Sequence, residues 1–320
     1  MRKRLLTASP KEILAMSKKE LLEAIRLSEG RVVMACARCR GPNLVDGVSN
    51  AEVVAAFGAD IVLLDTYDVK DPCIPGLPSK NPADDEVPEL RKVQIKLGRG
   101  WTLREIRELI GRPVGVLLTY APEDMRESLI EHYGNIFATR ETARIAAELG
   151  ADIIYIGGWG EECYSMVEEI VSEVGKKVII EFGRPHGPGL LGFSAPLHGT
   201  ELITEKEIKR IIDTGVDIIG LPAPGTYPGW TIQHASHLVK LIHDHGVLAS
   251  LGIHTSQEGS NVEIIQRIGI YAKMAGADII ELGDSGFTEQ MVPPENIMAL
   301  SIAIKGRRHT YRRMAFSILR

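Results

Sequence analysis

A five-residue motif recurs four times along this chain, and its spacing constrains the fold more than any other feature. Each copy is Gly-x-Asp followed by two β-branched residues, and each follows a segment with helical periodicity. The apolar run that the motif opens is typical of a parallel strand buried on both faces. These strand units lie at Gly58–Val62, Gly150–Ile154, Gly215–Ile219 and Gly276–Ile280.

A second pattern alternates with the first. A glycine that can end a helix in the left-handed conformation precedes another apolar run at Gly30, Gly111 and Gly175, and more loosely at Gly246. Two strand types, four of each, predict eight parallel strands with helical crossovers, which form a closed (β/α)8 TIM barrel. An open doubly wound sheet is the alternative, but it would lack the fourfold alternation. The strands are expected to begin at Val32, Ile61, Val114, Ile153, Val178, Ile218, Leu248 and Ile279.

The chain is expected to form one domain, because no linker rich in Gly, Ser or charge divides its 320 residues. We expect an N-terminal helical cap over residues 1–29, with an extra helix over 10–28 below the barrel. Eight βα units then occupy residues 30–292. A C-terminal helical extension over 293–320 begins at Pro293-Pro294, since proline fits the first turn of a helix.

The composition excludes several classes of protein. A net charge of −5 gives no footprint for nucleic acid, and the basic run from Lys305 to Arg313 is expected to face solvent or a second subunit. No apolar stretch of about 18 residues could span a membrane, and charged residues interrupt the N-terminal segment where a signal sequence would be apolar. We therefore expect a cytoplasmic homo-oligomer that acts on a small-molecule substrate. Neither a Walker loop nor a GxGxxG motif occurs, so no nucleotide cofactor is expected.

Alternation within the strands predicts which polar side chains point into the barrel. On the eighth strand, Ile279, Glu281 and Gly283 share one face. An unpaired carboxylate on the helix-covered face would cost several kcal/mol, so Glu281 should point inward. Aligning the repeats places six more polar residues on the inner face near the C-terminal ends of the strands, where barrels hold their chemistry: Arg38, Asp65, Thr119, Tyr155, Glu181 and His254.

This inward set predicts acid/base catalysis by Glu281, Glu181 and His254. Carboxyl groups inside an apolar barrel are expected to have raised pKa values, which suits proton transfer near neutral pH. Asp65, Glu181, His254 and Glu281 could instead share a divalent cation, because carboxylates and imidazole suit Mg²⁺, Mn²⁺ or Zn²⁺. In a purely structural alternative, Glu281 is satisfied by Arg38 or Tyr155, and His254 is a hydrogen-bonded core residue.

Other candidates follow the strands. Arg184 and His186, in a glycine-rich segment after the fifth strand, are expected to bind substrate, as are Arg38 and Thr119. Ser256, Asp284 and Ser285 after the last two strands could bind a phosphate or hydroxyl group, although Asp284 and Glu258 would repel a phosphate dianion. Cys36 and Cys39 form a CxxC, but Cys73 and Cys163 lack the paired spacing of a four-cysteine metal site, so reduced thiols, or disulfides if the source is a hyperthermophile, are expected instead.

The segment from Gly276 to Gly283 resembles a strand of the tryptophan-synthase-α type barrels. In that family the inward glutamate of such a strand is the base of a retro-aldol cleavage, which the resemblance implies for Glu281. The whole chain, with its ending from Pro294 to Tyr311, also resembles a group of uncharacterised bacterial TIM-barrel proteins, some loosely labelled phosphoenolpyruvate-mutase-like. The Asp-x-Asp pair and the Lys-x-Cys-Gly loop of that mutase superfamily are absent from this sequence.

Together these features predict a TIM-barrel lyase or isomerase that uses acid/base chemistry, with or without a metal. Its substrate is expected to be a small hydroxylated anion, such as a sugar phosphate or a keto or hydroxy acid. Two alternatives stay open: a metal-dependent hydrolase that uses the same residues, and a small-molecule-binding barrel without catalytic activity.

Overall fold

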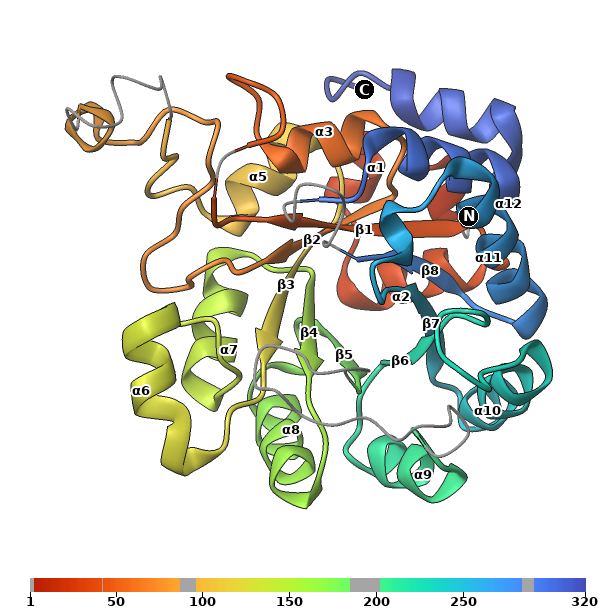
Figure 1. Cartoon of the computed structure of the whole chain (residues 1–320). Coiled ribbons are helices and arrows are strands. Elements are labelled where there is room, and N and C mark those ends of the chain that lie inside the picture. The colour runs from red at the N-terminus through yellow and green to blue at the C-terminus, as the bar shows by residue number, and fades with distance from the viewer. Residues whose placement is uncertain (1–2, 42, 87–95, 185–201, 284–290) are drawn as a thin grey trace.

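Eight parallel strands form a closed barrel in the computed structural model, which describes residues 3–41, 43–86, 96–184, 202–283 and 291–320. Each strand pairs with the next along the chain, and the last pairs with the first, so the predicted TIM barrel is confirmed (Figure 1). The strands are β1 (Val32–Arg38), β2 (Ile61–Asp65), β3 (Val114–Thr119), β4 (Ile153–Gly157), β5 (Ile179–Gly183), β6 (Ile218–Pro222), β7 (Leu248–Ile253) and β8 (Ile279–Leu282).

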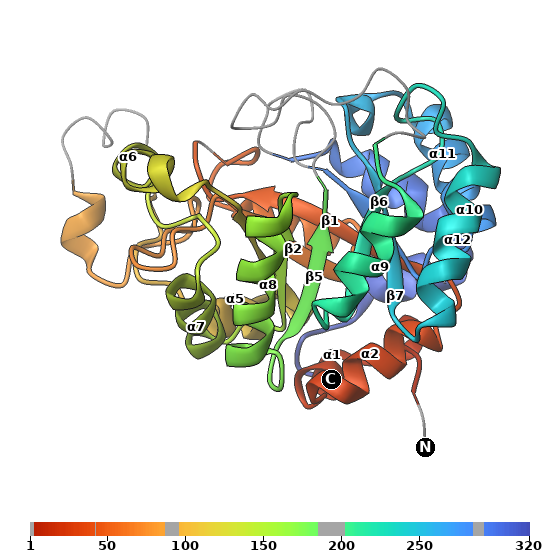
Figure 2. The ribbon, with the colours of Figure 1, turned by 90° about the horizontal axis from the view of Figure 1, so that it is seen from below.

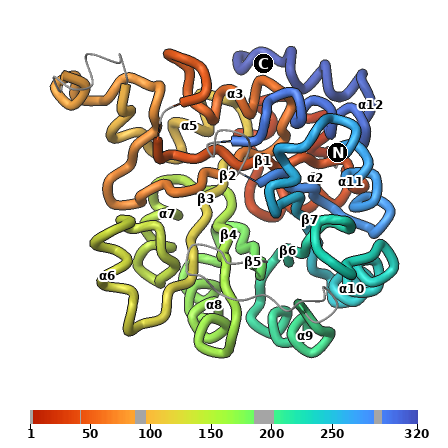
Figure 3. Tube along the Cα trace, viewed as in Figure 1, coloured from red at the N-terminus to blue at the C-terminus, as the bar shows by residue number. Residues whose placement is uncertain are grey.

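Helices surround the barrel in sequence order, and the tube in Figure 3 circles it once. Several of them begin with a capping box, in which a Ser or Thr and a glutamate three residues later satisfy each other's backbone N–H groups, as Thr204 and Glu207 do. The outer helices are α3 (Asn50–Ala56), α5 (Leu103–Ile110), α6 (Glu123–Tyr133), α7 (Arg140–Leu149), α8 (Glu161–Val174), α9 (Glu205–Asp213), α10 (Ile232–Asp244), α11 (Val262–Ala275) and α12 (Pro294–Ala315). None of the helices in the described ranges has both the length and the apolar character that a membrane crossing needs.

Two short helices, α1 (Pro10–Leu14) and α2 (Lys18–Arg26), replace the single helix expected over residues 10–28. The break has a local cause, because Ser17 and Glu20 form a capping box that starts a new helix. Apolar side chains from this N-terminal segment, such as Ile13 and Leu21, join the cluster that fills the lower barrel interior. The pair therefore closes the end of the barrel at which the strands begin (Figure 2).

The aspartate of each repeated motif has the same structural task. Its carboxylate accepts a hydrogen bond of 2.8–3.0 Å from a backbone N–H of the preceding strand, and it also binds a cationic or imidazole side chain. These bonds fix the register of neighbouring strands at the bottom of the barrel, which explains the repeat. The pairs are Asp60 with Lys305 and Arg313, Asp152 with Arg107, Asp217 with Lys18, and Asp278 with His243.

The basic C-terminal run was expected to face solvent or a subunit, and for two of its residues this is wrong. Lys305 and Arg313 are both buried, and their side chains bind Asp60 at 2.6 and 2.8 Å. A kink in α12 at Gly306, where φ is 75°, separates the two. The helix thereby attaches the end of the chain to the start of β2, while Arg307 and Arg308 remain exposed.

Candidate active site

The inner face of the barrel changes from apolar to polar toward the C-terminal ends of the strands. Residues that pair across parallel strands share a face, so Glu281, which pairs with Met34, points inward with that core residue. Glu181 pairs with Ile218, another residue of the interior cluster. Both carboxylates are buried, above a floor made by Val32, Met34, Ile61, Ile153, Ile179, Ile218, Leu248 and Ile279.

Glu281 lies between a thiol and an imidazole. The Sγ of Cys36 donates to its Oε1 at 3.6 Å, and Nε2 of His254 lies 3.7 Å from its Oε2. Gly252 makes this approach possible, since a Cβ there would overlap the His254 ring and lie 3.5 Å from Oε2 of Glu281. Two of the three predicted catalytic residues are thus brought together on β8 and at the end of β7.

Glu181, the third predicted catalytic residue, is fully buried, and only one of its two carboxyl oxygens has a hydrogen-bond partner in the described part of the chain. The hydroxyl of Ser250 donates to its Oε1, whereas its Oε2 has no hydrogen-bond partner within the described ranges. Burial, and then the nearby charge of Glu281, raise the pKa of Glu181 to about 8, against smaller opposing effects of Ser250 and His254. The raised pKa favours the protonated carboxyl group, whose second oxygen can donate a hydrogen bond or a proton.

Sequence reasoning missed Ser250, although a signal for it existed. Ser250 lies two residues before Gly252 on β7, so it shares the inner face that was assigned to Gly252 and His254. A serine that is 0% exposed inside a barrel needs a hydrogen-bond partner, and here that partner is Glu181.

Arg38 and Asp65 lie side by side at the ends of β1 and β2, where they pair in register. Nε of Arg38 is 3.4 Å from a carboxylate oxygen of Asp65, so this cation does not serve as the counter-ion of Glu281. The residues that follow Asp65 and His254 have left-handed backbone, with φ of 56° at Thr66 and 64° at Thr255. Such strain in non-glycine residues is characteristic of functional sites.

Within the described ranges, the structure does not bring the other predicted substrate-binding residues together at the two glutamates. Arg184 points toward the helix layer, where it binds Glu207 at 2.9 Å and lies over the Trp159 ring, so it is not brought to the carboxylates. Thr119 extends β3 through backbone bonds to residues 136 and 138, and Ser256 is exposed above β7. His186, Asp284 and Ser285 lie outside the described residues.

The four cysteines are free thiols with separate surroundings. Cys36 belongs to the interior, whereas Cys39 and Cys163 pack in the outer core and the Cys73 thiol donates to the carbonyl of Leu97. The described ranges contain no cluster of three or more His, Cys, Asp or Glu side chains arranged to hold a metal ion. Metal binding by Asp65, Glu181, His254 and Glu281 thus stays a prediction.

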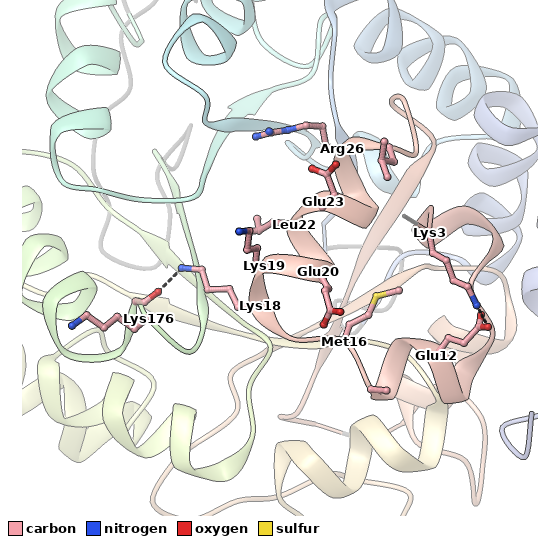
Figure 4. Close-up of a pocket in the computed structure, with 13 residues that line it drawn as sticks. Lys3, Glu12, Met16, Lys18, Lys19, Glu20, Leu22, Glu23, Arg26 and Lys176 are labelled. Carbon is pink, nitrogen blue, oxygen red and sulfur yellow. Dashed lines mark hydrogen bonds and ion pairs between the residues drawn. The ribbon is translucent and has the colours of Figure 1, made fainter. Parts of the chain in front are cut away.

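A large cavity of about 1290 Å³ opens at the other end of the barrel, beside α1 and α2 (Figure 4). Its walls carry charged side chains that bind within the chain: Lys18 donates to the carbonyl of Gly175 and pairs with Asp217, and Lys3 pairs with Glu12. The residues with candidate chemistry are all near the opposite ends of the strands, so we place the active site there.

The raised pKa of Glu181 makes stability depend on pH. The unfolded chain loses this proton near the ordinary value of 4.5, whereas the folded chain keeps it up to about 8, so the folded state binds more protons between these values. Stability therefore falls as pH rises through that window. Below pH 4.5, Glu181→Gln should be about as stable as wild type. Between pH 4.5 and about 8, its free energy of unfolding should exceed that of wild type by a growing margin. Urea unfolding at a series of pH values would measure this difference. A difference independent of pH would contradict the assignment.

Comparison with known proteins identifies a family but no reaction. The model of a family described as "Domain of unknown function (DUF7916)" matches residues 6–320. This description does not support the phosphoenolpyruvate-mutase-like label. No curated protein matches the chain.

Solved structures of similar shape include tryptophan synthase from M. tuberculosis, at 12% identity over 89% of this chain and 96% of that chain, with a TM-score of 0.46. They also include the carboxyl transferase domain of Rhizobium etli pyruvate carboxylase, at 14% identity over 95% of this chain and 51% of that one, with a TM-score of 0.48. Likeness at this level carries no argument about function.

Proposed function

The chain belongs to the DUF7916 family, and because membership assigns no reaction, we propose from the interior site that it is an acid/base lyase or isomerase. One observation carries this proposal. Glu181 is 0% exposed beside a second buried glutamate, Glu281, and one of its carboxyl oxygens has no partner in the described part of the chain. A buried polar atom without a partner is costly in a scaffold but useful in a site that a substrate completes.

The two glutamates are suited to different roles. Glu281 contacts the His254 imidazole and is the base that accepts a proton from the substrate. Glu181 carries the proton at neutral pH and is the acid, because its environment raises its pKa to about 8. An acid and a base inside one barrel are what proton abstraction followed by protonation at a neighbouring atom requires. Arg38, near the rim on β1, would attract an anionic substrate.

Solvent exchange tests this proposal without knowledge of the physiological substrate. Wild type in D2O containing EDTA should exchange the proton next to the carbonyl in at least one of hydroxyacetone, dihydroxyacetone phosphate and 2-oxobutyrate, as proton NMR would show. These compounds represent a hydroxy ketone, a sugar phosphate and a keto acid. Exchange of none of them would contradict the proposal and favour the binding barrel without activity.

A metal-dependent hydrolase is the second candidate, and a parallel series with divalent cations distinguishes it. If Asp65, Glu181, His254 and Glu281 hold a metal, Mg²⁺, Mn²⁺ or Zn²⁺ should raise the melting temperature, because ligands stabilise the state that binds them. His254→Ala should remove that rise. Melting unaffected by all three cations, together with exchange in EDTA, would leave the metal-free reaction.

A further inference from the structure

We propose that Tyr155 is a catalytic residue of this site, whose hydroxyl donates a hydrogen bond to a substrate oxygen that gains negative charge, and that the substrate is an α-hydroxy carbonyl compound. The inference rests on the proposed function, because it names the group that would stabilise the intermediate formed when Glu281 removes a proton.

Tyr155 occupies the centre of the polar layer. It lies on the inner face of β4, where it pairs in register with Leu117 on one side and Glu181 on the other. Tyr155 also interacts electrostatically with Glu281, Glu181 and Cys36, so its phenol lies among residues of β8, β5 and β1. The ring is half-buried, so the side chain is part of the interior without being sealed from the mouth of the barrel.

Two glycines on the next two strands of the barrel make space for the phenol. A Cβ on Gly183 of β5 would overlap the Tyr155 hydroxyl, and one on Gly220 of β6 would lie 3.1 Å from it. The same Gly220 position is 3.4 Å from Oγ of Ser250, the residue that holds Glu181. The hydroxyl groups of Tyr155 and Ser250 therefore both lie close to Gly220, and a side chain at this position of β6 would push them apart.

The half-buried Tyr155 differs from the three buried tyrosines, whose hydroxyl groups all bond to the protein. Tyr67 donates to the Trp101 carbonyl at 2.9 Å, Tyr120 to Glu162 at 3.1 Å and Tyr164 to Glu207 at 3.5 Å. Tyr155 makes no such bond within the described ranges.

The ring is only half-buried, so a hydroxyl group that makes no bond within the described part of the chain is open to a ligand that enters from the mouth of the barrel. The unpaired Oε2 of Glu181 comes from the neighbouring strand.

Two unpaired donors on adjacent strands favour a substrate with two adjacent oxygens. Glu281 takes the proton from the carbon that bears the hydroxyl group, the C–H electron pair forms a C=C bond, and the carbonyl becomes an enediolate oxygen. Tyr155 donates a hydrogen bond to that oxygen, and Glu181 donates to its neighbour or delivers its proton to the adjacent carbon. When Glu181 protonates the former carbonyl carbon, the C=C electron pair forms the new C–H bond and the hydroxyl proton of the substrate moves to the enediolate oxygen as the second carbonyl forms. The proton on Glu281 returns to Glu181 through water, so the reaction needs no oxidant or co-reactant.

Acetohydroxamate is the probe, because its planar C(O)–N–O group has the shape of an enediolate. The full chain, labelled with 3-fluorotyrosine at its eight tyrosines, is titrated with it in EDTA and followed by ¹⁹F NMR. The Tyr155 resonance, identified by its loss in Tyr155→Phe, should shift on binding. Tyr155→Phe should weaken binding by about tenfold or more, because it removes a hydrogen bond to a charged oxygen.

Tyr164→Phe is the matched control, since it removes a buried hydroxyl outside the barrel interior. That variant should bind the probe as wild type does, and the Tyr164 resonance should not move during the titration. The proposal is overturned if wild type does not bind the probe, or if Tyr155→Phe binds it as tightly as wild type.

Glu281→Gln separates this inference from the proposed function. Binding of the probe requires no proton transfer from carbon, so Glu281→Gln should still bind it while losing solvent exchange. Unchanged probe binding by Tyr155→Phe, with exchange present in wild type, overturns the role of Tyr155 alone. Probe binding that depends on Tyr155 without any exchange in wild type overturns the proposed reaction and keeps the oxygen-binding role.

Discussion

Asp60→Asn is expected to lower the free energy of unfolding by about 3–5 kcal/mol, because it leaves buried cations without their counter-ion. The carboxylate binds Lys305 and Arg313, and all three side chains are at most 1% exposed. Although burial opposes it, these two cations hold the pKa of Asp60 below its ordinary value. Lys305, whose pKa burial lowers to about 8, can release its proton in the variant, but Arg313 cannot.

Asp278→Asn is the matched control for that measurement. Asp278 has the same place in its repeat and also accepts a backbone bond, at 2.9 Å from Ala249. Its partner His243 is 39% exposed, so water can solvate the imidazolium when the carboxylate is lost. Urea unfolding at neutral pH should show a much smaller loss for Asp278→Asn, about 1 kcal/mol. Equal losses would mean that the backbone bond, and not the buried cations, determines the effect.

Glu281→Gln should lower the rate of solvent exchange by about 10² or more, since the amide cannot accept a proton. The substitution keeps the volume of the side chain and its ability to bond Cys36 and His254. Glu162→Gln provides the control, because that glutamate accepts a bond from Tyr120 outside the barrel interior, at 3.1 Å. A full exchange rate in Glu281→Gln would exclude Glu281 as the base.

Much of the fold follows from the repeated motif because the motif has a physical task. Its glycine ends a helix, its aspartate fixes the register with the preceding strand, and the next two residues start a buried strand. Seven of the eight strands begin at the predicted residue, and β5 begins one residue later, at Ile179. Strict alternation in buried strands likewise placed Glu181 and Glu281 inside the barrel.

What the sequence could not show depends on contacts between distant residues. Nothing near Lys305 or Arg313 indicates that both reach Asp60, which is more than 200 residues earlier in the chain. Arg184, in the glycine-rich segment after β5, was expected to bind substrate, but it follows the inward Gly183 and so turns to the helix layer and binds Glu207. Side-chain partners in a closed barrel are set by three-dimensional packing, which alternation along one strand does not define.

Unfolding of Glu281→Gln beside wild type, in the same buffer at neutral pH, tests the central claim most directly. If Glu281 serves catalysis, the variant should be as stable as wild type or more stable, because a buried amide costs less than a buried carboxylate. If Glu281 is instead a structural ion-pair partner of His254, the variant should lose about 3–5 kcal/mol. Stability at or above that of wild type is the result we predict, and a loss of that size would contradict the assignment of this site.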